Sequence, residues 1–595
     1  MFLKIGISNK QTYLSIVQGY RDINGKSKQR TVMALGYLSN LRKKYDDPIA
    51  FYKTFAKEMD ATYSEEEKIN FHVKGNEELE INTDNQKHLG YLPFKKIYNE
   101  LELNNFFKKY QKKLTVKYNL NNIFSLLIYS QLLFPGSKKK TIASKDKYFE
   151  SFNFSLDDVY RSLNYFNAYS KDIQKHLHYK VKELYGRKDE LGYYDVTNYY
   201  FEIPYNDEDE LDEAGNIIKK GFRKRGPSKE HKPDPIIQMG LLMDSNSIPM
   251  AFNTFSGNES EKTSLLPTIK RVKADYKLDR VIVVADRGLN TSDNTFFLAG
   301  KNDDAHKLDG YIFKQTILGA DAKFKEYVLQ TNDKNNPYII TQKIDRYGKS
   351  YNIKYKSRIF GKTLTIIRDG KRKNKVTVYQ KQVIVYSAKT AKKQKKDREK
   401  VLLKAQDLIN NPTKYNKSTT DFGSAKYIKN LAFVRTTGEI ADGLHLKLDL
   451  DKIKEEEKYD GYYAIVTSEL HLSDNEIIDI YKGLWEIEES FKIIKSEFKA
   501  RPVYLRLEDH INAHFLVCFV ALIILRLLEI KLEKKFTVKK IKDSLFNFNC
   551  SYIDQNYYLV NFYNDCTKRI CELFECDLGK KFITLAKIKK IFQNQ

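Results

Sequence analysis

Three acidic residues occupy positions in which phosphoryl-transfer chemistry would use them. Asp195 lies in the middle of LGYYDVTNYYFEI (191–203), which is typical of a strand, and Asp286 ends the apolar run VIVVAD. Glu488 lies in YKGLWEIEESFKIIK (481–495), whose spacing is typical of a helix. Two-metal phosphoryl transfer uses carboxylates that hold divalent ions about 4 Å apart. A buried mid-strand aspartate has few structural explanations, because an unpaired buried charge is costly.

The helical segment 481–495 predicts a polar stripe. At ~100° per residue, one side of a regular helix would carry Tyr481, Glu488, Lys492 and Lys495, with Trp485 at its edge. A carboxylate flanked by lysines and aromatic rings suits metal and phosphate. Two structural explanations stay open. Glu488 can simply pair with Lys492 on an exposed helix, and Trp485 can pack in the core.

The elements around the two aspartates follow a recognisable order. The strand that holds Asp195 is followed by a hairpin around DSNS, then by the helix EKTSLLPTIKRVKADY, then by the strand that ends at Asp286. Strands in this order can bring both carboxylates to one edge of a sheet, where a glutamate from a later helix can join them.

A charged segment separates the first two of these strands. NDEDELDEAGNIIKKGFRKRGPSKEHKPD passes from an acidic run to a basic one. One interpretation is a solvated, mobile loop. The other is a segment that contacts DNA through its cationic side chains, namely Arg223, Lys224, Arg225 and Lys229.

The rest of the chain divides into several further regions. An N-terminal β-rich unit has two strands joined by an Asn24-Gly25 turn. A mostly strand-like stretch after the second aspartate contains the basic helix KTAKKQKKDREKVLLKAQDLI and indicates a separate insert. The predicted domains are an N-terminal β-unit (1–60), a helical DNA-binding region (88–187), the first part of a catalytic core (188–300), a β-rich insertion (301–457), the second part of the core (458–530) and a C-terminal region (531–595).

The composition of the chain limits the classes of molecule that it can bind. The formal net charge of the 595 residues is +26, which favours a polyanion such as DNA. A lysine-rich solubilising surface would give the same number. The five cysteines form no CxxC pair and have no histidine at zinc spacing, so we expect reduced thiols. The most apolar run, 515–525, is about half the length that a bilayer span needs. We expect a buried helix and a soluble protein without membrane partners.

These motifs together resemble the bacterial insertion-sequence DDE transposases whose acidic helix carries a Tyr-x2-Arg-x3-Glu-x6-Lys signature. Tyr481, Glu488 and Lys495 match this signature, whereas Leu484 stands at the arginine position. YYDVTNYYFE and VVADRGLNT resemble the strands of the two aspartates. The resemblance implies an α/β ribonuclease-H-like core interrupted by a β-rich insertion, accompanied by the N-terminal β-unit and the helical domain.

The resemblance also implies roles for individual residues. Asp195, Asp286 and Glu488 would bind two Mg²⁺ (or Mn²⁺) ions. Contacts to the terminal phosphates or bases of a transposon end would come from Tyr481, Lys492, Lys495, Arg287 and Trp485. Histidines 510 and 514, on the next helix, are expected to pack rather than to bind metal.

The implied activity is that of a bacterial, cytoplasmic and nucleoid-associated transposase. It would bind inverted-repeat ends as a homodimer, cut them and join the 3′-hydroxyls to target DNA. Three alternatives stay open at this point. They are a nuclease of the same core that does not join strands, a catalytically dead DNA-binding derivative, and a Mg²⁺ phosphohydrolase built on DVTN.

Overall fold

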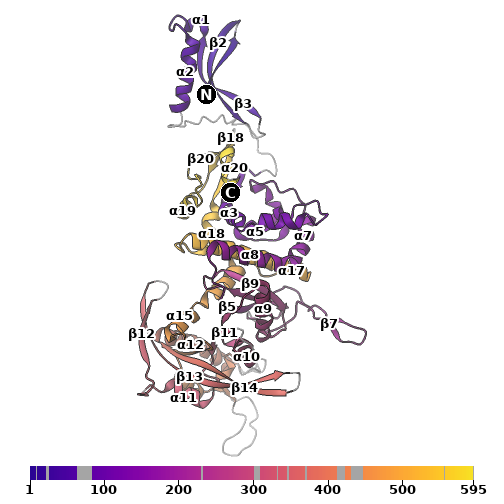
Figure 1. Ribbon diagram of the computed structural model, residues 1–595, viewed down its shortest axis with the longest axis vertical. Coiled ribbons are helices and arrows are strands. Elements are labelled where there is room, and N and C mark those ends of the chain that lie inside the picture. The colour runs from indigo at the N-terminus through magenta and orange to yellow at the C-terminus, as the bar shows by residue number, and fades with distance from the viewer. Residues whose placement is uncertain are drawn as a thin grey trace, which may run out of the picture. The chain divides into compact units, whose positions relative to one another are not determined.

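A computed structural model shows how the chain folds into two compact units (Figure 1). It describes residues 1–8, 10–21, 26–62, 84–229, 232–299, 309–331, 333–344, 348–368, 372–411, 423–430, 446–554 and 556–593. The first unit comprises residues 1–170, 497–499 and 509–595, and the second comprises 171–496 and 500–508. The predicted Asn24-Gly25 turn lies outside the described residues.

A single large sheet forms the centre of the second unit. Its strands are β5 (Leu191–Tyr200), β8 (Ile236–Met243), β9 (Pro249–Ser256), β10 (Ile282–Ala285), β11 (Gly310–Gln315), β12 (Ile339–Ile344), β13 (Ser350–Arg368), β14 (Arg372–Ser387) and β17 (Tyr462–Thr467). Their order across the sheet is β12-β13-β14-β17-β11-β10-β5-β8-β9. The strand of Asp195, the hairpin and the strand that ends at Asp286 therefore form as the sequence predicts.

The half of this sheet that holds the aspartates has the expected ribonuclease-H-like arrangement. β5, β8 and β9 are antiparallel, and β10 and β11 then run parallel to β5. All eight residues of β8 are buried, as a central strand covered on both faces requires. Helix α9 (Glu261–Tyr276) closes one face through an apolar cluster that includes Tyr194, Val196, Leu265, Ile269 and Val272.

The β-rich insertion differs from the prediction of a separate unit over 301–457. β11 falls inside that range, yet it pairs with β10 as part of the core sheet. β14 pairs with β17, so the long β13–β14 hairpin extends the same sheet instead of starting a new one (Figure 1). An open edge strand offers unpaired N–H and C=O groups, and β14 satisfies those of β17. The same range also contains the basic helix α12 (Ala388–Asn410) and α14 (Leu450–Glu457).

The acidic helix is not one regular helix. It consists of α15 (Asp474–Lys482), α16 (Trp485–Lys492) and a π-helical turn, Ile493–Glu497. Between α15 and α16 the backbone bonds tighten to i→i+3 spacing, for example from Leu484 N–H to the Tyr481 carbonyl. The single polar stripe predicted from ~100° per residue is therefore wrong in its angles, because both the tight turn and the π-turn change the rotation per residue.

The first unit combines small sheets with helices. β1 (Phe2–Ser8), which the sequence analysis did not predict, joins β2 (Gln11–Arg21) and β3 (Ser27–Tyr37), and α2 (Pro48–Thr62) follows them. The helical region contains α3 (Leu92–Glu100), α4 (Leu103–Gln111), α5 (Leu120–Leu133) and α7 (Leu156–Ala168). The C-terminal strands β18 (Asn549–Asp554), β19 (Tyr557–Val560) and β20 (Phe582–Thr584) form a sheet with β4 (Gln86–His88).

Helix α17 (Glu508–Lys531) is long and apolar enough to cross a bilayer by length and composition. However, 89% of its most apolar window is buried inside the protein, as in the core helix of a globular domain. It continues past Arg526, where the apolar run ends, because that buried guanidinium pairs with Glu529 at 2.8 Å. All five cysteines are buried and free.

Gly483 allows α15 to approach β5 closely. The Tyr193 hydroxyl donates a 2.9 Å hydrogen bond to the Ile480 carbonyl. A Cβ at position 483 would lie 2.3 Å from that hydroxyl oxygen. Only glycine therefore fits between the acidic helix and the strand of Asp195.

We predict that Gly483→Ala destabilises the second unit by about 1–3 kcal/mol, because the new methyl group overpacks against Tyr193. Thermal unfolding of the full chain measures the loss. Tyr193→Phe removes the nearest oxygen, so the double variant should lose less than the sum of the single losses. Gly19→Ala, where a Cβ meets nothing within 4 Å, is the control. Strict additivity would contradict the contact.

Candidate active site

The register between β5 and β10 brings the two aspartates together. The parallel pairing matches Leu191 with Ile282 and Tyr193 with Val284. Continued by two residues, the same register places Asp286 level with Asp195, on the same face of the sheet. Tyr193, two residues before Asp195 and on the same face of β5, contacts α15, so the acidic helix lies on the face of the sheet that carries the Asp195 side chain.

Asp195 is a largely buried carboxylate with one fixed oxygen. The backbone N–H of Val196 donates to its Oδ1 at 2.8 Å. Burial raises the pKa of the Asp195 carboxyl to about 6, against the lowering effect of the nearby Lys229 ammonium. The negative charges of Glu261 and Asp286 raise this pKa as well. Such a carboxylate gains from a bound cation.

Asp286 is half-exposed and has two partners. The Tyr481 hydroxyl donates to its Oδ1 at 3.4 Å, and the Lys314 ammonium, on β11, lies 3.6 Å from the same oxygen. Burial, followed by the Asp286 charge, raises the pKa of the Tyr481 phenol far above its ordinary value. Tyr481 therefore stays protonated and acts as a donor.

Glu488 lies on α16 with an exposed side chain and lines the same cleft as Tyr481. Its negative charge also contributes to the raised pKa of Tyr481, after burial and the charge of Asp286. Within the described ranges, no group of three or more His, Cys, Asp or Glu side chains is close enough to hold a metal ion. Glu488 thus lines the cleft beside Tyr481, which contacts Asp286, and the three carboxylates do not form a closed ligand set in the described residues.

The donor chemistry of these residues fits a divalent cation. Carboxylate oxygens are the ligands that Mg²⁺ and Mn²⁺ prefer. Burial raises the pKa of Asp195 in spite of Lys229 and the Val196 N–H, and a bound cation would stabilise its charged form further. Asp195 and Asp286 would hold such an ion, and Glu488 would complete the set from the helix.

Two lysines lie near Asp195. Lys495 belongs to the π-turn, with its ammonium 5.5 Å from the centroid of the Tyr199 ring. Burial, together with the charge of Lys229, lowers the pKa of Lys495 to about 8. The Lys229 ammonium donates to the Val196 carbonyl at 2.5 Å. Both lysines were among the cationic residues predicted from the sequence.

The remaining residues of the signature helix occupy different environments. Trp485 is 40% exposed and lines the cleft, which does not fit the alternative of a core tryptophan. Leu484, at the signature arginine position, also lines the cleft but is only 7% exposed. Lys492 is exposed on α16.

The two arginines predicted to bind DNA from the charged segment between β5 and β8 make contacts within that segment. Arg223 pairs with Asp207 at 2.5 Å, and Arg225 donates to the carbonyls of Pro204 and Pro233. Both guanidiniums therefore fasten the segment to itself. Their contact with DNA stays a prediction.

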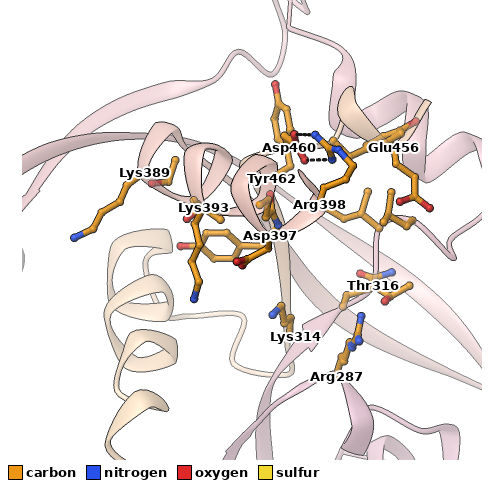
Figure 2. A pocket seen from close by; sticks show the side chains of 18 of the residues that line it. Arg287, Lys314, Thr316, Lys389, Lys393, Asp397, Arg398, Glu456, Asp460 and Tyr462 are labelled. Carbon is orange, nitrogen blue, oxygen red and sulfur yellow. Dashed lines mark hydrogen bonds and ion pairs between the residues drawn. The ribbon is translucent and has the colours of Figure 1, made fainter. Parts of the chain in front are cut away.

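A cleft of about 1230 Å³ leads from the acidic helix to α12. Figure 2 shows Lys389 and Lys393 on α12, with Arg287 and Lys314 on the core side of the same cleft. Further cationic side chains in its lining are Arg398, Lys426, Lys452 and Lys482. Arg398 pairs with Asp460, which ties α12 to the loop before β17.

Sequence reasoning missed Lys314, Glu261 and the cleft-facing lysines of α12. No sequence motif marked Lys314 as a site residue, since it is a single lysine within a strand. Glu261 follows the helix cap Ser260, which made it look like a helix-start residue. The sequence showed the lysines of α12 only as a basic run. It could not predict that two of them face the cleft, because residues from distant parts of the chain form that cleft.

We predict that Asp195→Asn raises the melting temperature of the metal-free protein by about 2–4 °C at pH 7.5. The folded pKa of about 6 exceeds the unfolded value, so the protonated carboxyl of Asp195 stabilises the folded state. This stabilisation is lost as pH rises through 6. Asparagine avoids this loss and still accepts from Val196. The difference should vanish below about pH 4.

Melting in the presence of Mn²⁺ tests whether Asp195 binds a metal ion. The ion should raise the melting temperature of the wild-type protein and leave that of Asp195→Asn unchanged. A variant that melts below the wild type in chelator, or that responds to Mn²⁺ as the wild type does, would contradict the assignment of Asp195.

Comparison with protein families places the chain. Residues 218–524 match the model of the transposase DDE domain, and residues 4–69 match that of the N-terminal domain of IS1634 family transposases. The first match covers more than half of the chain and includes Asp286 and Glu488, whereas Asp195 precedes it. None of the curated proteins matches the chain. The two family matches agree with the motifs and with the sheet, and the chain belongs to the DDE transposases of insertion sequences.

Proposed function

We propose that this transposase binds the inverted-repeat ends of its element, cleaves them with two Mg²⁺ or Mn²⁺ ions and joins the 3′-hydroxyls to target DNA. The family acts on DNA and generally uses divalent metal ions. The observation that carries the proposal is the parallel β5–β10 register, which continues to Asp195 and Asp286, and it is supported by the basic cleft that Glu488 lines.

Asp195, Asp286 and Glu488 are the proposed metal ligands. When bound, two ions would activate water or a 3′-hydroxyl and stabilise the leaving oxygen. The chain's own contribution is orientation. The Val196 N–H fixes one oxygen of Asp195, and the Tyr481 hydroxyl fixes one oxygen of Asp286.

The basic cleft is the proposed path of the DNA end. Cationic side chains from the core and from α12 line it, and phosphates are the groups that such side chains bind. Trp485, exposed beside Glu488, offers a ring on which an unpaired base can stack. Lys492, Lys495 and Tyr481 are the proposed contacts to the terminal phosphates. Joining two ends in one event needs two active sites, so the proposal includes a homodimer on DNA.

The test is a cleavage and strand-transfer assay with a labelled DNA fragment that carries the element's end. We expect metal-dependent cutting and joining by the wild type and loss of both, by a factor of at least ~10³, in Asp195→Ala, Asp286→Ala and Glu488→Ala. Asp479→Ala, an exposed carboxylate on α15 that pairs with Lys343, is the control.

The outcomes separate the alternatives. Cutting without joining would identify a nuclease of the same core. Binding without cutting by the wild type would identify a catalytically dead derivative, and Leu484→Arg would then be the first variant to make. Full activity of Glu488→Ala would remove the glutamate from the proposed mechanism.

The path of the DNA can be tested separately. We predict that Lys389→Ala combined with Lys393→Ala weakens DNA binding and reduces the slope of log affinity against log salt by about 1.8, because each phosphate that a lysine neutralises contributes about 0.9 to that slope. Lys392→Ala combined with Lys396→Ala removes two exposed lysines of α12 that lie outside the cleft lining. Equal effects of both double variants would argue against the cleft.

A further inference from the structure

Lys229 is held beside Asp195 by two contacts. Its ammonium donates to the Val196 carbonyl at 2.5 Å and lies 3.3 Å from Oε1 of Glu261. Val196 is the residue whose N–H fixes the Asp195 carboxylate. The ammonium therefore sits within one residue of a proposed metal ligand, although it reaches there from the segment before β8.

Glu261 lies near both Lys229 and the turn that follows Asp286. It is the first residue of α9, after the Ser260 cap. Its Oε2 lies 3.9 Å from where a Cβ of Gly288 would be, in the turn that follows Asp286. From this place the carboxylate reaches the Lys229 ammonium on one side and the turn after Asp286 on the other.

A lysine ammonium and a divalent cation can compete for the Asp195 carboxylate. A lysine ammonium beside a carboxylate can occupy the position that a divalent cation needs. In the part of the chain that the structure describes, the Lys229 ammonium forms its ion pair with Glu261 and not with Asp195. The pair is net neutral, so Lys229 in this position does not neutralise Asp195. Removing Glu261 would leave an uncompensated ammonium beside Asp195.

We propose that Glu261 is a positioning residue that holds the Lys229 ammonium on the Val196 carbonyl and off the Asp195 carboxylate, so that Asp195 is open to a divalent cation. The inference rests on the proposed role of Asp195 as a metal ligand. It gives Lys229 a task at the metal site, in place of the DNA contact predicted from the basic segment.

A double-mutant cycle on Mn²⁺ affinity tests this proposal. Mn²⁺ binding to the DNA-free full-length protein is measured by electron paramagnetic resonance. We expect Glu261→Gln to weaken binding about 3- to 10-fold, because the freed ammonium competes for Asp195. Lys229→Met should bind at least as tightly as the wild type, and the double variant should return to within about twofold of it. Ionic strength is kept low, because the Lys229 and Glu261 side chains are 44% and 40% exposed.

Two controls distinguish the ways in which the proposal can fail. Lys224→Met removes a lysine of the same segment that pairs with Asp209, and it should leave Mn²⁺ affinity unchanged. Asp195→Asn should abolish the binding. If Asp195→Asn binds Mn²⁺ normally, the proposed metal site itself is wrong.

If Asp195→Asn loses Mn²⁺ while Glu261→Gln keeps full affinity, only the positioning role fails. If Glu261→Gln and the double variant lose affinity equally, Glu261 is itself a ligand and the proposal is overturned. Circular dichroism and thermal unfolding establish that each variant folds. Glu261→Asp keeps the negative charge, so it should retain more affinity for Mn²⁺ than Glu261→Gln does.

Discussion

The parallel pairing of β5 with β10 is the constraint on which the site depends. Asp195 lies inside one strand and Asp286 just beyond the other, and only their register brings the two carboxylates level. A slip by one residue would turn the Asp195 side chain to the opposite face, against α9. Buried side chains on both faces of the sheet hold the register, since a slip would expose Tyr194 and Val196.

The acidic helix reaches this pair because one residue has no side chain. Gly483 lets the turn between α15 and α16 lie against Tyr193, two residues before Asp195. The same turn separates Tyr481, which contacts Asp286, from Glu488, which lines the cleft. The strand of Asp195 and the acidic helix are therefore packed together at Gly483. Tyr481 and Glu488 lie on the two sides of this contact.

The insertion contributes a wall to the site instead of an independent domain. Since β14 pairs with β17, the hairpin is part of the core sheet and the basic helix follows directly from it. The Arg398–Asp460 pair adds a second attachment. Lysines on α12 thus face the same cleft as Arg287 and Lys314 from the core (Figure 2). Charge that is spread over the whole sequence becomes a local field where a phosphate backbone can bind.

The sequence by itself determined the elements and the chemistry. Strand and helix periods, turn residues and the spacing of Tyr481, Glu488 and Lys495 are local properties, so the strand of Asp195, the hairpin, α9 and α12 were all predictable. The resemblance carried by these motifs identified the family, which the comparisons confirm.

The tertiary structure decided what depends on contacts between distant residues. The turn at Gly483 contacts Tyr193, nearly three hundred residues earlier, and a regular helical projection could not show this contact. Arg223 and Arg225 looked like free cations in the sequence, yet their partners are intramolecular. Glu261 looked like a helix-start residue, and only the fold places it against Lys229 beside Asp195. Spacing along the chain specifies which side chains are present, whereas strand register and packing specify which of them meet.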